Sequence, residues 1–510
     1  MTLSAMTPAM PHIFPTVLQM LGAAGDAAPE RVALRCGEER LTYREYVSCV
    51  AGFAEVLGGA VRGGRVALIM PNSIDAAVAT FAILAAGAQA VPLNPAYTVH
   101  ELRSILADAE PTAIVCDAAL QDLIGSLAAE LGIGRTIVVE AGSRLTRWAS
   151  RRLSLPAFPD AHALAILQYT GGTTGRSKGV NLTHCAVSTN VAQREALLPS
   201  GPGEKILIVT PTYHSYAIAM GLLLAPYCRG TLSILQRYRP EDALRTIEAH
   251  GITLFAGSPT LFVGLMAHQA FATTNFASLR LCFSGSSALP METMRRWEAA
   301  TGCTICEGYG QSEAGPVLTF NPRDGIRKQG SVGVPLPLTE VQTVDCDTGT
   351  RPLGPNEPGE IRARGPQIMS GYRNRPEESA AALRDGWLYT GDIGAIDQDG
   401  HLFILDRKKD MAIVGGFNVY PREIEEALCA HPAVEEAAVI GVPDSYRGEV
   451  LIGYVVLRRP DASESNALTS YLAERLTRYK IPRDIRICTT LPKTTVGKID
   501  KAALKAAHRG

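Results

Sequence analysis

The sequence has little charge imbalance and no apolar run long enough to span a membrane. Its 49 basic and 50 acidic residues give a net charge of −1 over 510 residues, so no global attraction to nucleic acid or to an anionic membrane is expected. The longest apolar candidate, residues 76–92, is shorter than the roughly 20 residues that cross a bilayer. Residues 1–21 carry no basic residue before their apolar part and no clear cleavage site, so we predict neither a transmembrane segment nor a signal peptide.

The cysteines also lack a pairing pattern. There are eleven, an odd number scattered along the chain, which predicts reduced thiols and a cytoplasmic location. Cys303 and Cys306 have CxxC spacing, but a structural zinc site needs a second such pair and none is present. A redox motif stays open, and an ordinary strand through TGCTICEGY is favoured.

What the sequence does have is a regular alternation of strand-like and helix-like segments. Hydrophobic residues make up 46% and charged residues 19% of the chain, enough for two or more domains with sizeable cores. We predict strands at residues 65–71, 90–93, 112–116, 136–139, 206–209, 253–256 and 280–283, and helices at 74–88 and 240–250. Such alternation is typical of an α/β fold with largely parallel sheets.

Composition changes toward the C-terminus. Prolines, glycines and short apolar runs indicate a β-rich subdomain over about 332–405. The four charged residues 407–410 predict a bend between domains. After them we predict helices at 421–428 and 467–475, and strands at 435–440, 451–457 and 484–489. The expected architecture is a large N-terminal domain, residues 1–408, and a small mobile α+β domain, residues 409–510.

One loop is dense in glycine, hydroxyls and cations. Residues 168–181 read QYTGGTTGRSKGVN, and such a loop can bring backbone N–H groups close to an anion. Its candidate phosphate-binding residues are Thr170, Gly171, Gly172, Thr173, Thr174, Gly175 and Lys178. It is not a Walker A loop, because Ser177 and not glycine precedes Lys178. A surface loop without a ligand is the alternative.

Four further segments combine residues that suit chemistry. They read ICEGYGQSEAGP (305–316), LYTGDIG (388–394), LDRKKDMAIVGGFNVYPREIE (405–425) and LPKTTVGKIDK (491–501). An aromatic ring, a hydroxyl and a carboxylate within five residues, as at Tyr309, Ser312 and Glu313, could stack a base, bind a phosphate and hold Mg²⁺. Taken singly, each segment also reads as an ordinary turn or surface stretch.

Together and in this order, the five segments resemble the adenylate-forming enzyme superfamily, over nearly the whole chain. That superfamily includes acyl-CoA synthetases, nonribosomal peptide adenylation domains and firefly luciferase. The resemblance implies that the loop at 168–181 embraces the β- and γ-phosphates of ATP. Gly172 stands where serine is frequent and Ser177 where proline is frequent, and both changes favour a more flexible loop.

The resemblance also implies roles for individual residues. The nucleotide site is expected to comprise the phosphate loop together with Gly285, Ser286, Ser287, Glu307, Gly308, Tyr309, Ser312, Asp392 and Arg407, with Tyr309 on adenine and Asp392 and Arg407 on the ribose. Glu313 is expected to bind Mg²⁺, and Lys498 to contact the substrate carboxylate and the adenylate. Lys409 is the expected hinge between domains. The expected lining of the thiol tunnel is Gly415, Gly416, Phe417 and Asn418.

These residue types fit a two-step reaction. A carboxylate is a poor electrophile, but its attack on the α-phosphorus of ATP gives an acyl-adenylate with AMP as a stable leaving group. The transition state gathers negative charge, which a lysine, Mg²⁺ and oriented N–H groups stabilise. A thiol then attacks the same carbonyl, and one small domain serves both steps by rotating at a hinge.

The aromatic segment PTYHSYAIAMG, residues 211–221, narrows the branch. It contains no acid that could pair with an ammonium group, so α-amino acids are disfavoured as substrates, and coenzyme A is the expected thiol because no carrier-protein domain follows. By resemblance to acyl- and aryl-CoA ligases, His214 adjoins the reacting carbonyl and screens the thiol tunnel, and a structural histidine is the alternative. By resemblance to plant 4-coumarate-CoA ligases, the acyl pocket is lined by Tyr216, Met220, Phe283, Ser286, Gly308, Pro316 and Val317. Bulky apolar walls without a fixed cation predict a medium-chain fatty or aryl monocarboxylate.

Three alternatives remain beside an acid–CoA ligase of fatty acid metabolism. The chain could be an acyl-AMP ligase that loads a carrier protein, or a non-catalytic nucleotide-binding homologue, and a kinase is disfavoured by the lysine spacing. A homo-oligomer stays open. Lys498 lies in a tail of the kind that acetylation switches off in related enzymes.

Overall fold

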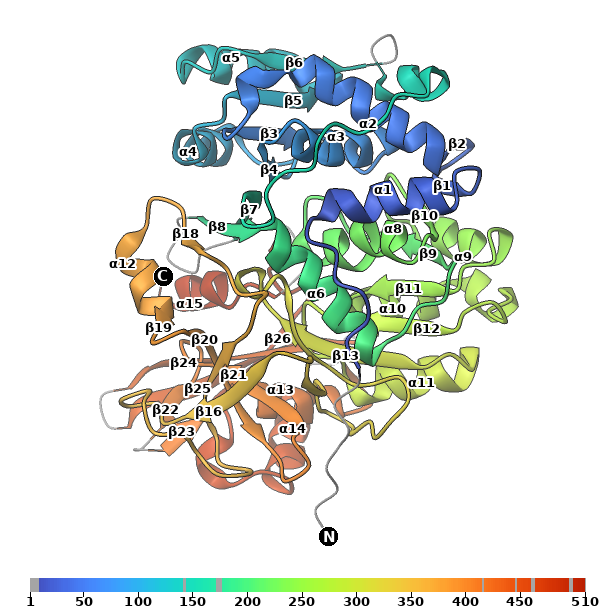
Figure 1. Cartoon of the computed structure of the whole chain (residues 1–510). Coiled ribbons are helices and arrows are strands. Elements are labelled where there is room, and N and C mark those ends of the chain that lie inside the picture. The colour runs from blue at the N-terminus through green and yellow to red at the C-terminus, as the bar shows by residue number, and fades with distance from the viewer. Residues whose placement is uncertain are drawn as a thin grey trace. The chain divides into compact units, whose positions relative to one another are not determined.

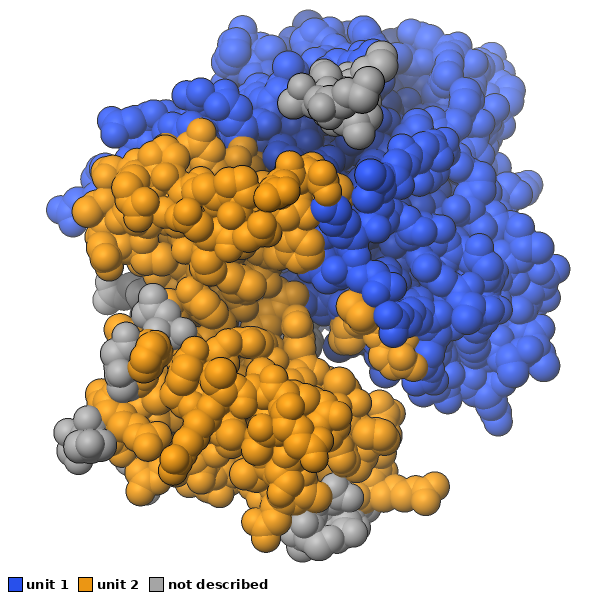
Figure 2. All heavy atoms as spheres, turned by 90° about the horizontal axis from the view of Figure 1, so that it is seen from below, with its two compact units in different colours: residues 1–289, 293–340, 363–388 blue, residues 290–292, 341–362, 389–510 orange. Residues whose placement is uncertain are grey.

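The computed structural model describes residues 9–140, 144–170, 177–414, 417–444, 447–459, 464–494 and 499–509 (Figure 1). The chain divides into two compact units, coloured separately in Figure 2. Unit 1 comprises residues 1–289, 293–340 and 363–388, and unit 2 comprises residues 290–292, 341–362 and 389–510. Within the described ranges, no helix is both long and apolar enough to cross a membrane.

The larger sheet of unit 1 is parallel through its centre. Its strand order is β15-β14-β13-β12-β11-β9-β10-β1-β2. The strands are β1 (Val32–Cys36), β2 (Glu39–Thr42), β9 (Lys205–Ile208), β10 (Thr231–Ile234), β11 (Leu254–Gly257), β12 (Leu281–Ser284), β13 (Ile305–Gly310), β14 (Val317–Phe320) and β15 (Val334–Pro335). All neighbours from β1 to β13 pair in parallel, whereas β2, β14 and β15 are antiparallel additions. The carboxyl ends of β9, β11, β12 and β13 therefore lie at one edge.

The second sheet of unit 1 has the order β18-β8-β7-β4-β3-β5-β6. Its strands are β3 (Arg65–Ile69), β4 (Gln89–Pro92), β5 (Ala113–Asp117), β6 (Thr136–Val139), β7 (Leu164–Thr170), β8 (Lys178–Thr183) and β18 (Gly371–Tyr372). Strands β7 and β8 are antiparallel, and Thr170 lies opposite Lys178. The glycine-rich loop thus joins two paired strands.

Helices connect and cover these strands. They are α1 (Val17–Ala27), α2 (Tyr43–Leu57), α3 (Ile74–Ala85), α4 (Val99–Ala109), α5 (Gln121–Glu130), α6 (His184–Leu197), α7 (Ser215–Ala217), α8 (Leu224–Tyr227), α9 (Pro240–Ala249), α10 (Pro259–Ala267), α11 (Met291–Thr301) and α12 (Pro376–Ala382). Thr16, Thr42 and Thr98 start α1, α2 and α4 with reciprocal capping boxes. Every residue of α3 is buried, which fits its largely apolar sequence, and its one charged residue, Asp75, pairs with Arg144.

Short helical turns complete unit 1 and part of unit 2. A π-helical segment, Ile218–Leu223, lies between α7 and α8. The 3₁₀ turns are η1 (Gly59–Val61), η2 (Ala118–Leu120), η3 (Leu145–Arg151), η5 (Gln269–Thr273), η6 (Ser312–Ala314) and η7 (Arg478–Lys480). π-helical segments occur often at functional sites, and this one overlaps the end of the aromatic segment, residues 211–221, that contains His214.

Unit 2 holds a compact C-terminal sheet with the order β23-β22-β25-β24, and β26 pairs with β25. Its strands are β22 (Ala412–Val414), β23 (Phe417–Val419), β24 (Val434–Asp444), β25 (Gly448–Leu457) and β26 (Asp484–Cys488), and its helices are α13 (Pro421–Cys429), α14 (Glu464–Ala473) and α15 (Lys501–Arg509). Another sheet contains β16 (Glu340–Val344), β17 (Gly359–Arg364), β19 (Leu383–Arg384), β20 (Trp387–Ile396) and β21 (Leu402–Arg407). Apolar residues of α13, α14 and the C-terminal sheet form one core.

The predicted α/β class, with a large N-terminal part and a small C-terminal one, is confirmed. Most predicted strands shift by one or two residues at their ends, and the strand predicted at 136–139 coincides with β6. The helix predicted to reach residue 88 ends at Ala85, because Gly87 adopts a φ of +76°. TGCTICEGY yields β13, and all eleven cysteines are free thiols, with the sulfur atoms of Cys282 and Cys303 3.6 Å apart. The domain limits at 408 and 409 stay a prediction.

Candidate active site

The candidate nucleotide residues of unit 1 follow the carboxyl ends of neighbouring parallel strands. Residues 285–287 come directly after β12, and residues 307–313 include the end of β13 and the turn η6. Ser284 pairs with Glu307 across these strands. In parallel α/β sheets, ligands bind at this edge because the loops there converge.

The loop after β12 is backbone-strained. Ser286 has a φ of 71° and is exposed, an uncommon conformation for a residue with a Cβ and one that clusters at functional sites. Beside it, a Cβ on Gly285 would lie 2.9 Å from the Tyr216 ring. Glycine at 285 therefore lets this loop pass close to the aromatic segment.

The end of β13 presents Tyr309 beside two constrained neighbours. Glu307 is buried and accepts a hydrogen bond from the Leu289 N–H at 2.8 Å. A Cβ on Gly308 would meet the Phe320 ring at 2.6 Å. Tyr309 itself is half-buried, so part of its surface remains available for stacking.

Three segments meet around Ser312 and Glu313. The Ser312 hydroxyl lies 3.4 Å from the Ser215 hydroxyl, which joins the aromatic segment to this turn. The Tyr372 hydroxyl donates to Glu313 Oε1 at 2.8 Å. Burial, together with the negative charge of Glu313, raises the pKa of Tyr372 above its usual range, so the hydroxyl stays a proton donor. The ammonium of Lys178 lies 5.0 Å from the Tyr372 ring centroid.

The glycine-rich loop is anchored on both sides, although Gly171, Gly172, Thr173, Thr174 and Gly175 lie outside the described residues. Thr170 ends β7, and Lys178 begins β8 opposite it. Gln168 donates to the carbonyl oxygen of Tyr213 at 3.1 Å. The strand that enters the loop is thus tied to the segment that contains His214.

The proposed acyl-pocket residues come from α7, the π-helical segment and strands β12, β13 and β14 with their adjoining loops. His214 caps α7 and accepts the Tyr216 N–H at 3.3 Å through Nδ1. Tyr216, Met220, Phe283 and Val317 are all buried, and Phe283 packs edge-on against Phe320 with ring centroids 6.2 Å apart. Pro316 and Val317 lead into β14, where the side-chain amide of Asn190 binds both the N–H and the carbonyl oxygen of Val317.

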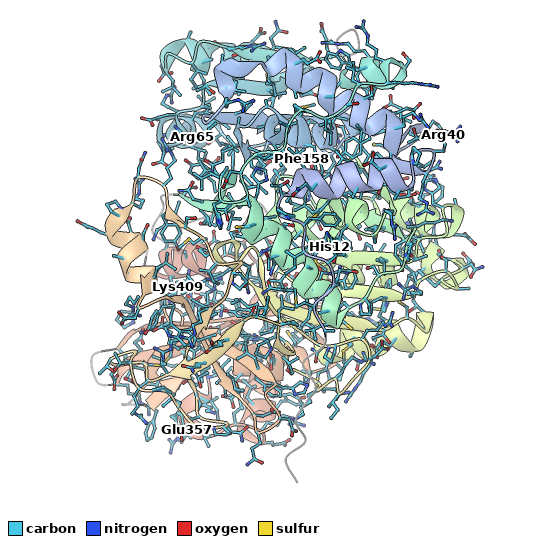
Figure 3. All side chains as sticks on the ribbon, in the orientation of Figure 1. His12, Arg40, Arg65, Phe158, Glu357 and Lys409 are labelled. Atoms are coloured by element: carbon cyan, nitrogen blue, oxygen red, sulfur yellow. The ribbon has the colours of Figure 1, made fainter. Side chains whose placement is uncertain are left out.

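In unit 2, Asp392 and Arg407 form a cross-strand pair. Residue 392 lies opposite 407 on β20 and β21, and Arg407 Nε is 3.3 Å from Asp392 Oδ1. Asp392 is buried, and Arg407 is half-exposed. This pair presents an acceptor and a donor side by side, as ribose hydroxyls require. Lys409, labelled in Figure 3, lies just beyond β21 in the turn before β22.

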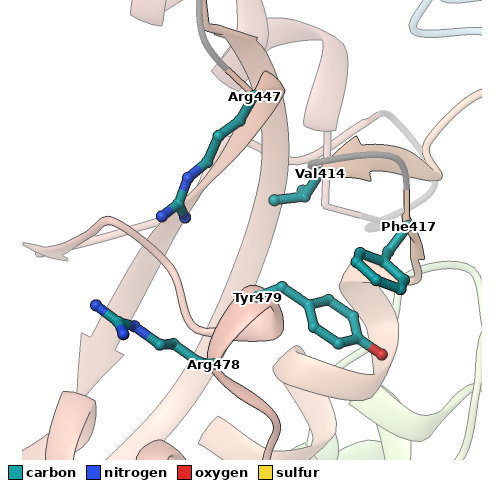
Figure 4. A pocket seen from close by; sticks show the side chains of 5 residues that line it. All are labelled: Val414, Phe417, Arg447, Arg478 and Tyr479. Atoms are coloured by element: carbon teal, nitrogen blue, oxygen red, sulfur yellow. The ribbon is translucent and has the colours of Figure 1, made fainter.

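A pocket of about 350 Å³ lies within unit 2, lined by Val414, Phe417, Arg447, Arg478 and Tyr479 (Figure 4). The Phe417 and Tyr479 rings are stacked, with centroids 4.6 Å apart and planes 17° apart, and Phe417 is 56% exposed. The two guanidinium groups lie on the opposite side of the pocket from the Phe417 ring. Gly415, Gly416, the Asn418 side chain and Lys498 lie outside the described residues.

Two partners of these residues were missed by sequence reasoning. Tyr372 lies 59 residues from Glu313 in sequence, and the local sequence Gly371-Tyr372 does not by itself indicate a binding or catalytic role. Arg194 is buried with its guanidinium carbon 4.5 Å from the Phe283 ring centroid, so a fixed cation lies against one residue that is predicted to line the acyl pocket. From sequence alone, adjacent arginine and glutamate residues near the end of a helix predict a solvent-exposed ion pair, so the burial of Arg194 was not expected.

The sequence profile of the AMP-binding enzyme family matches residues 22–373, and that of the AMP-binding enzyme C-terminal domain matches residues 423–498. A long-chain-fatty-acid–CoA ligase of Bacillus subtilis (strain 168) is 36% identical, over 96% of this chain and 95% of the relative. A feruloyl-CoA synthase of an Amycolatopsis species is 35% identical, over 94% and 96%. ATP-bound MatB from Rhodopseudomonas palustris superimposes with a TM-score of 0.90 at 33% identity, over 97% and 99%.

Proposed function

Because this chain belongs to the AMP-binding enzyme family, in the acyl-CoA synthetase branch of the adenylate-forming superfamily, we propose that its acid substrate is a medium-chain fatty or aryl monocarboxylate. The coarse activity, AMP-forming ligation of a carboxylic acid to coenzyme A, follows from the family. ATP and coenzyme A are its co-substrates.

The observation that carries the ligase activity is the convergence of three segments at the carboxyl edge of the larger sheet. Ser215, Ser312 and the Tyr372–Glu313 pair bring hydroxyls and a carboxylate together there. In the first step, a substrate carboxylate oxygen attacks the α-phosphorus, and the bond from that phosphorus to the pyrophosphate oxygen breaks. In the second, the thiol sulfur attacks the acyl carbon, the bond to the AMP oxygen breaks, and the thiol proton is released. Hydroxyl and N–H donors at this edge would orient the α-phosphate.

Glu313 fits the role of a Mg²⁺ ligand. A carboxylate is the hard oxygen donor that this ion prefers, and Mg²⁺ is commonly held by one or two carboxylates plus substrate phosphates. The ion would neutralise phosphate charge, while Tyr372 holds the carboxylate in place.

The remaining nucleotide roles stay proposals by resemblance. Asp392 and Arg407 would grip the ribose, for which their cross-strand geometry is suited. Tyr309 would stack on adenine. Lys409 would act as the hinge and Lys498 as the adenylation lysine.

The unit 2 pocket suits the nucleotide end of coenzyme A. Stacked aromatic rings bind a purine through its flat face, and arginine binds phosphates through paired N–H donors. Phe417, Tyr479, Arg447 and Arg478 supply both groups around one cavity. Phe417, which lines the pocket, also belongs to the proposed thiol tunnel.

The deciding experiment is a panel of acids assayed for ATP–pyrophosphate exchange and for AMP release with coenzyme A. We expect acid-dependent exchange and coenzyme A-dependent AMP release, both greatest for medium-chain or aryl monocarboxylates. Exchange without consumption of coenzyme A would instead favour an acyl-AMP ligase that loads a carrier protein. A profile that peaks at amino acids, dicarboxylates, acetate or long-chain acids would refute the proposed substrate.

The coenzyme A pocket has its own test. Arg447→Glu should raise the KM for coenzyme A by about tenfold or more, since one charge-assisted contact contributes about 1.5–3 kcal/mol, and should leave ATP–pyrophosphate exchange unchanged. Arg458→Glu, an exposed arginine of the same unit outside the pocket, serves as the matched control. Equal KM values in the two variants would remove the pocket from coenzyme A binding.

A further inference from the structure

A buried ion pair lies behind the proposed acyl pocket. Arg194 and Glu195, near the end of α6, have side-chain exposures of only 2% and 4%. Glu195 accepts hydrogen bonds from Arg194 and also from the N–H and hydroxyl of Ser200, at 2.8 and 3.0 Å. The carboxylate is therefore well satisfied, and it fixes one side of the guanidinium.

The other side of the guanidinium is not satisfied. Arg194 Nε and Nη2 are buried, and neither has a hydrogen-bond partner among the described residues. Buried donors without acceptors are rare and destabilising. A ligand with a hydrogen-bond acceptor beside Nε and Nη2 would satisfy both donors.

The guanidinium packs against Phe283, and the helix that carries it also binds Val317; both residues are proposed to line the acid site. Its carbon lies over the Phe283 ring. Burial raises the pKa of Tyr216, and the positive charge of Arg194 opposes that rise, which places this charge within electrostatic reach of the phenol. One turn earlier on α6, Asn190 binds the backbone of Val317 on both sides.

The charge of the pair restricts the ligand. Arg194 and Glu195 together carry no net charge, so an added carboxylate would leave an uncompensated negative charge in a buried place. A neutral oxygen, such as a hydroxyl, ether or ketone oxygen, accepts the same hydrogen bonds without that penalty.

We propose that Arg194 is a specificity-determining residue, which selects monocarboxylates with a neutral oxygen acceptor at the end far from the reacting carboxylate. The Nε and Nη2 groups donate to that oxygen, and Glu195 and Ser200 hold the guanidinium in place. The inference rests on the proposed function, because it requires that Phe283 and Tyr216 line the acid site.

The test compares acids that differ only by the oxygen. The aryl pair is cinnamic acid and its para-hydroxy derivative. The aliphatic pair is octanoic acid and 7-oxooctanoic acid, whose ketone lies next to the terminal methyl group. The two pairs show whether the oxygen acceptor belongs to an aryl or to an aliphatic acid. We expect wild-type kcat/KM to favour the oxygenated acid in at least one pair by about 10- to 100-fold, as for a hydrogen bond to a charged donor. No preference in either pair, or a stronger preference for the matched dicarboxylate, overturns the proposal.

Variants then locate the preference. Arg194→Met/Glu195→Gln removes both charges, so no lone charge stays buried. In this variant kcat/KM for the oxygenated acid should fall until the two acids of a pair differ by no more than about twofold. The control Arg280→Met/Glu204→Gln removes another arginine–glutamate pair of unit 1 and should keep the preference. A preference that survives in the first variant overturns the role of Arg194. Should no acid support exchange in the wild type, the proposed function itself fails.

Discussion

Replacing Tyr372 by phenylalanine removes one hydrogen bond from the proposed Mg²⁺ ligand and little else. The lost contact is the 2.8 Å bond from the Tyr372 hydroxyl to Glu313 Oε1. The phenylalanine ring retains the shape and face that Lys178 approaches at 5.0 Å. A hydrogen bond to a charged group contributes about 1.5–3 kcal/mol, and loss of a residue that orients a metal ligand typically costs 10- to 100-fold in affinity.

We therefore expect Tyr372→Phe to raise the Mg²⁺ concentration for half-maximal ATP–pyrophosphate exchange by about tenfold or more. Saturating Mg²⁺ should restore most of the rate, because the ligand itself is still present. Tyr46→Phe is the matched control: it removes a tyrosine hydroxyl that donates to the Ala77 carbonyl oxygen at 3.2 Å, in a part of unit 1 without candidate site residues. An unchanged Mg²⁺ titration, or a loss that saturating Mg²⁺ does not relieve, would refute this reasoning.

Three further predictions concern the two half-reactions and acid stability. Lys409→Pro, which fixes φ near −65° at the proposed hinge, should leave exchange largely intact and cripple thioester formation, whereas equal loss of both would argue against a hinge there. Lys498→Ala should lower acid-dependent exchange by about 10² or more, yet form acyl-CoA from supplied acyl-adenylate at near wild-type rate; loss of both steps would contradict its assignment to adenylation alone. Burial lowers the pKa of His184 from 6.5 to about 4, so the unfolded chain binds a proton before the folded one does as pH falls from about 6.5. The free energy of unfolding should then drop by up to about 3 kcal/mol by pH 4, a slope that urea titrations should find flattened in His184→Gln.

Sequence reasoning located the strands well because the buried parallel strands are short apolar runs bounded by turn residues. The ends of elements were predicted less accurately, as the helix predicted over 74–88 shows. Residues 85, 86 and 88 are all alanine and have the same helix propensity, so only the positive φ of Gly87 ends the helix. The extension of the larger sheet by β1 and β2 was also missed, since pairing of β1 with β10 joins segments about 200 residues apart.

The candidate site was predictable where its chemistry is contiguous in sequence. Tyr309, Ser312 and Glu313 fall within five residues, and the structure places them at the end of β13 and in η6. Tyr372 and Arg194 were not predictable, because their importance depends on which distant residue they contact. The packing of α6 that brings Arg194 over Phe283 and the pairing of β18 with β8 decide those contacts, and neither follows from a local sequence pattern.

The two-sided hydrogen bond between Asn190 and Val317 bears on how such an enzyme can change its substrate over evolutionary time. The amide binds both backbone groups of Val317 at the start of β14, so this wall of the proposed acid pocket is tied to the helix that carries Arg194. Mutations at 190, 194 and 317 should therefore be epistatic, since residues that share a network do not contribute additively. A change of acid specificity, in evolution or in a mutant library, should therefore be reached sooner when these three positions vary together than when they vary one at a time.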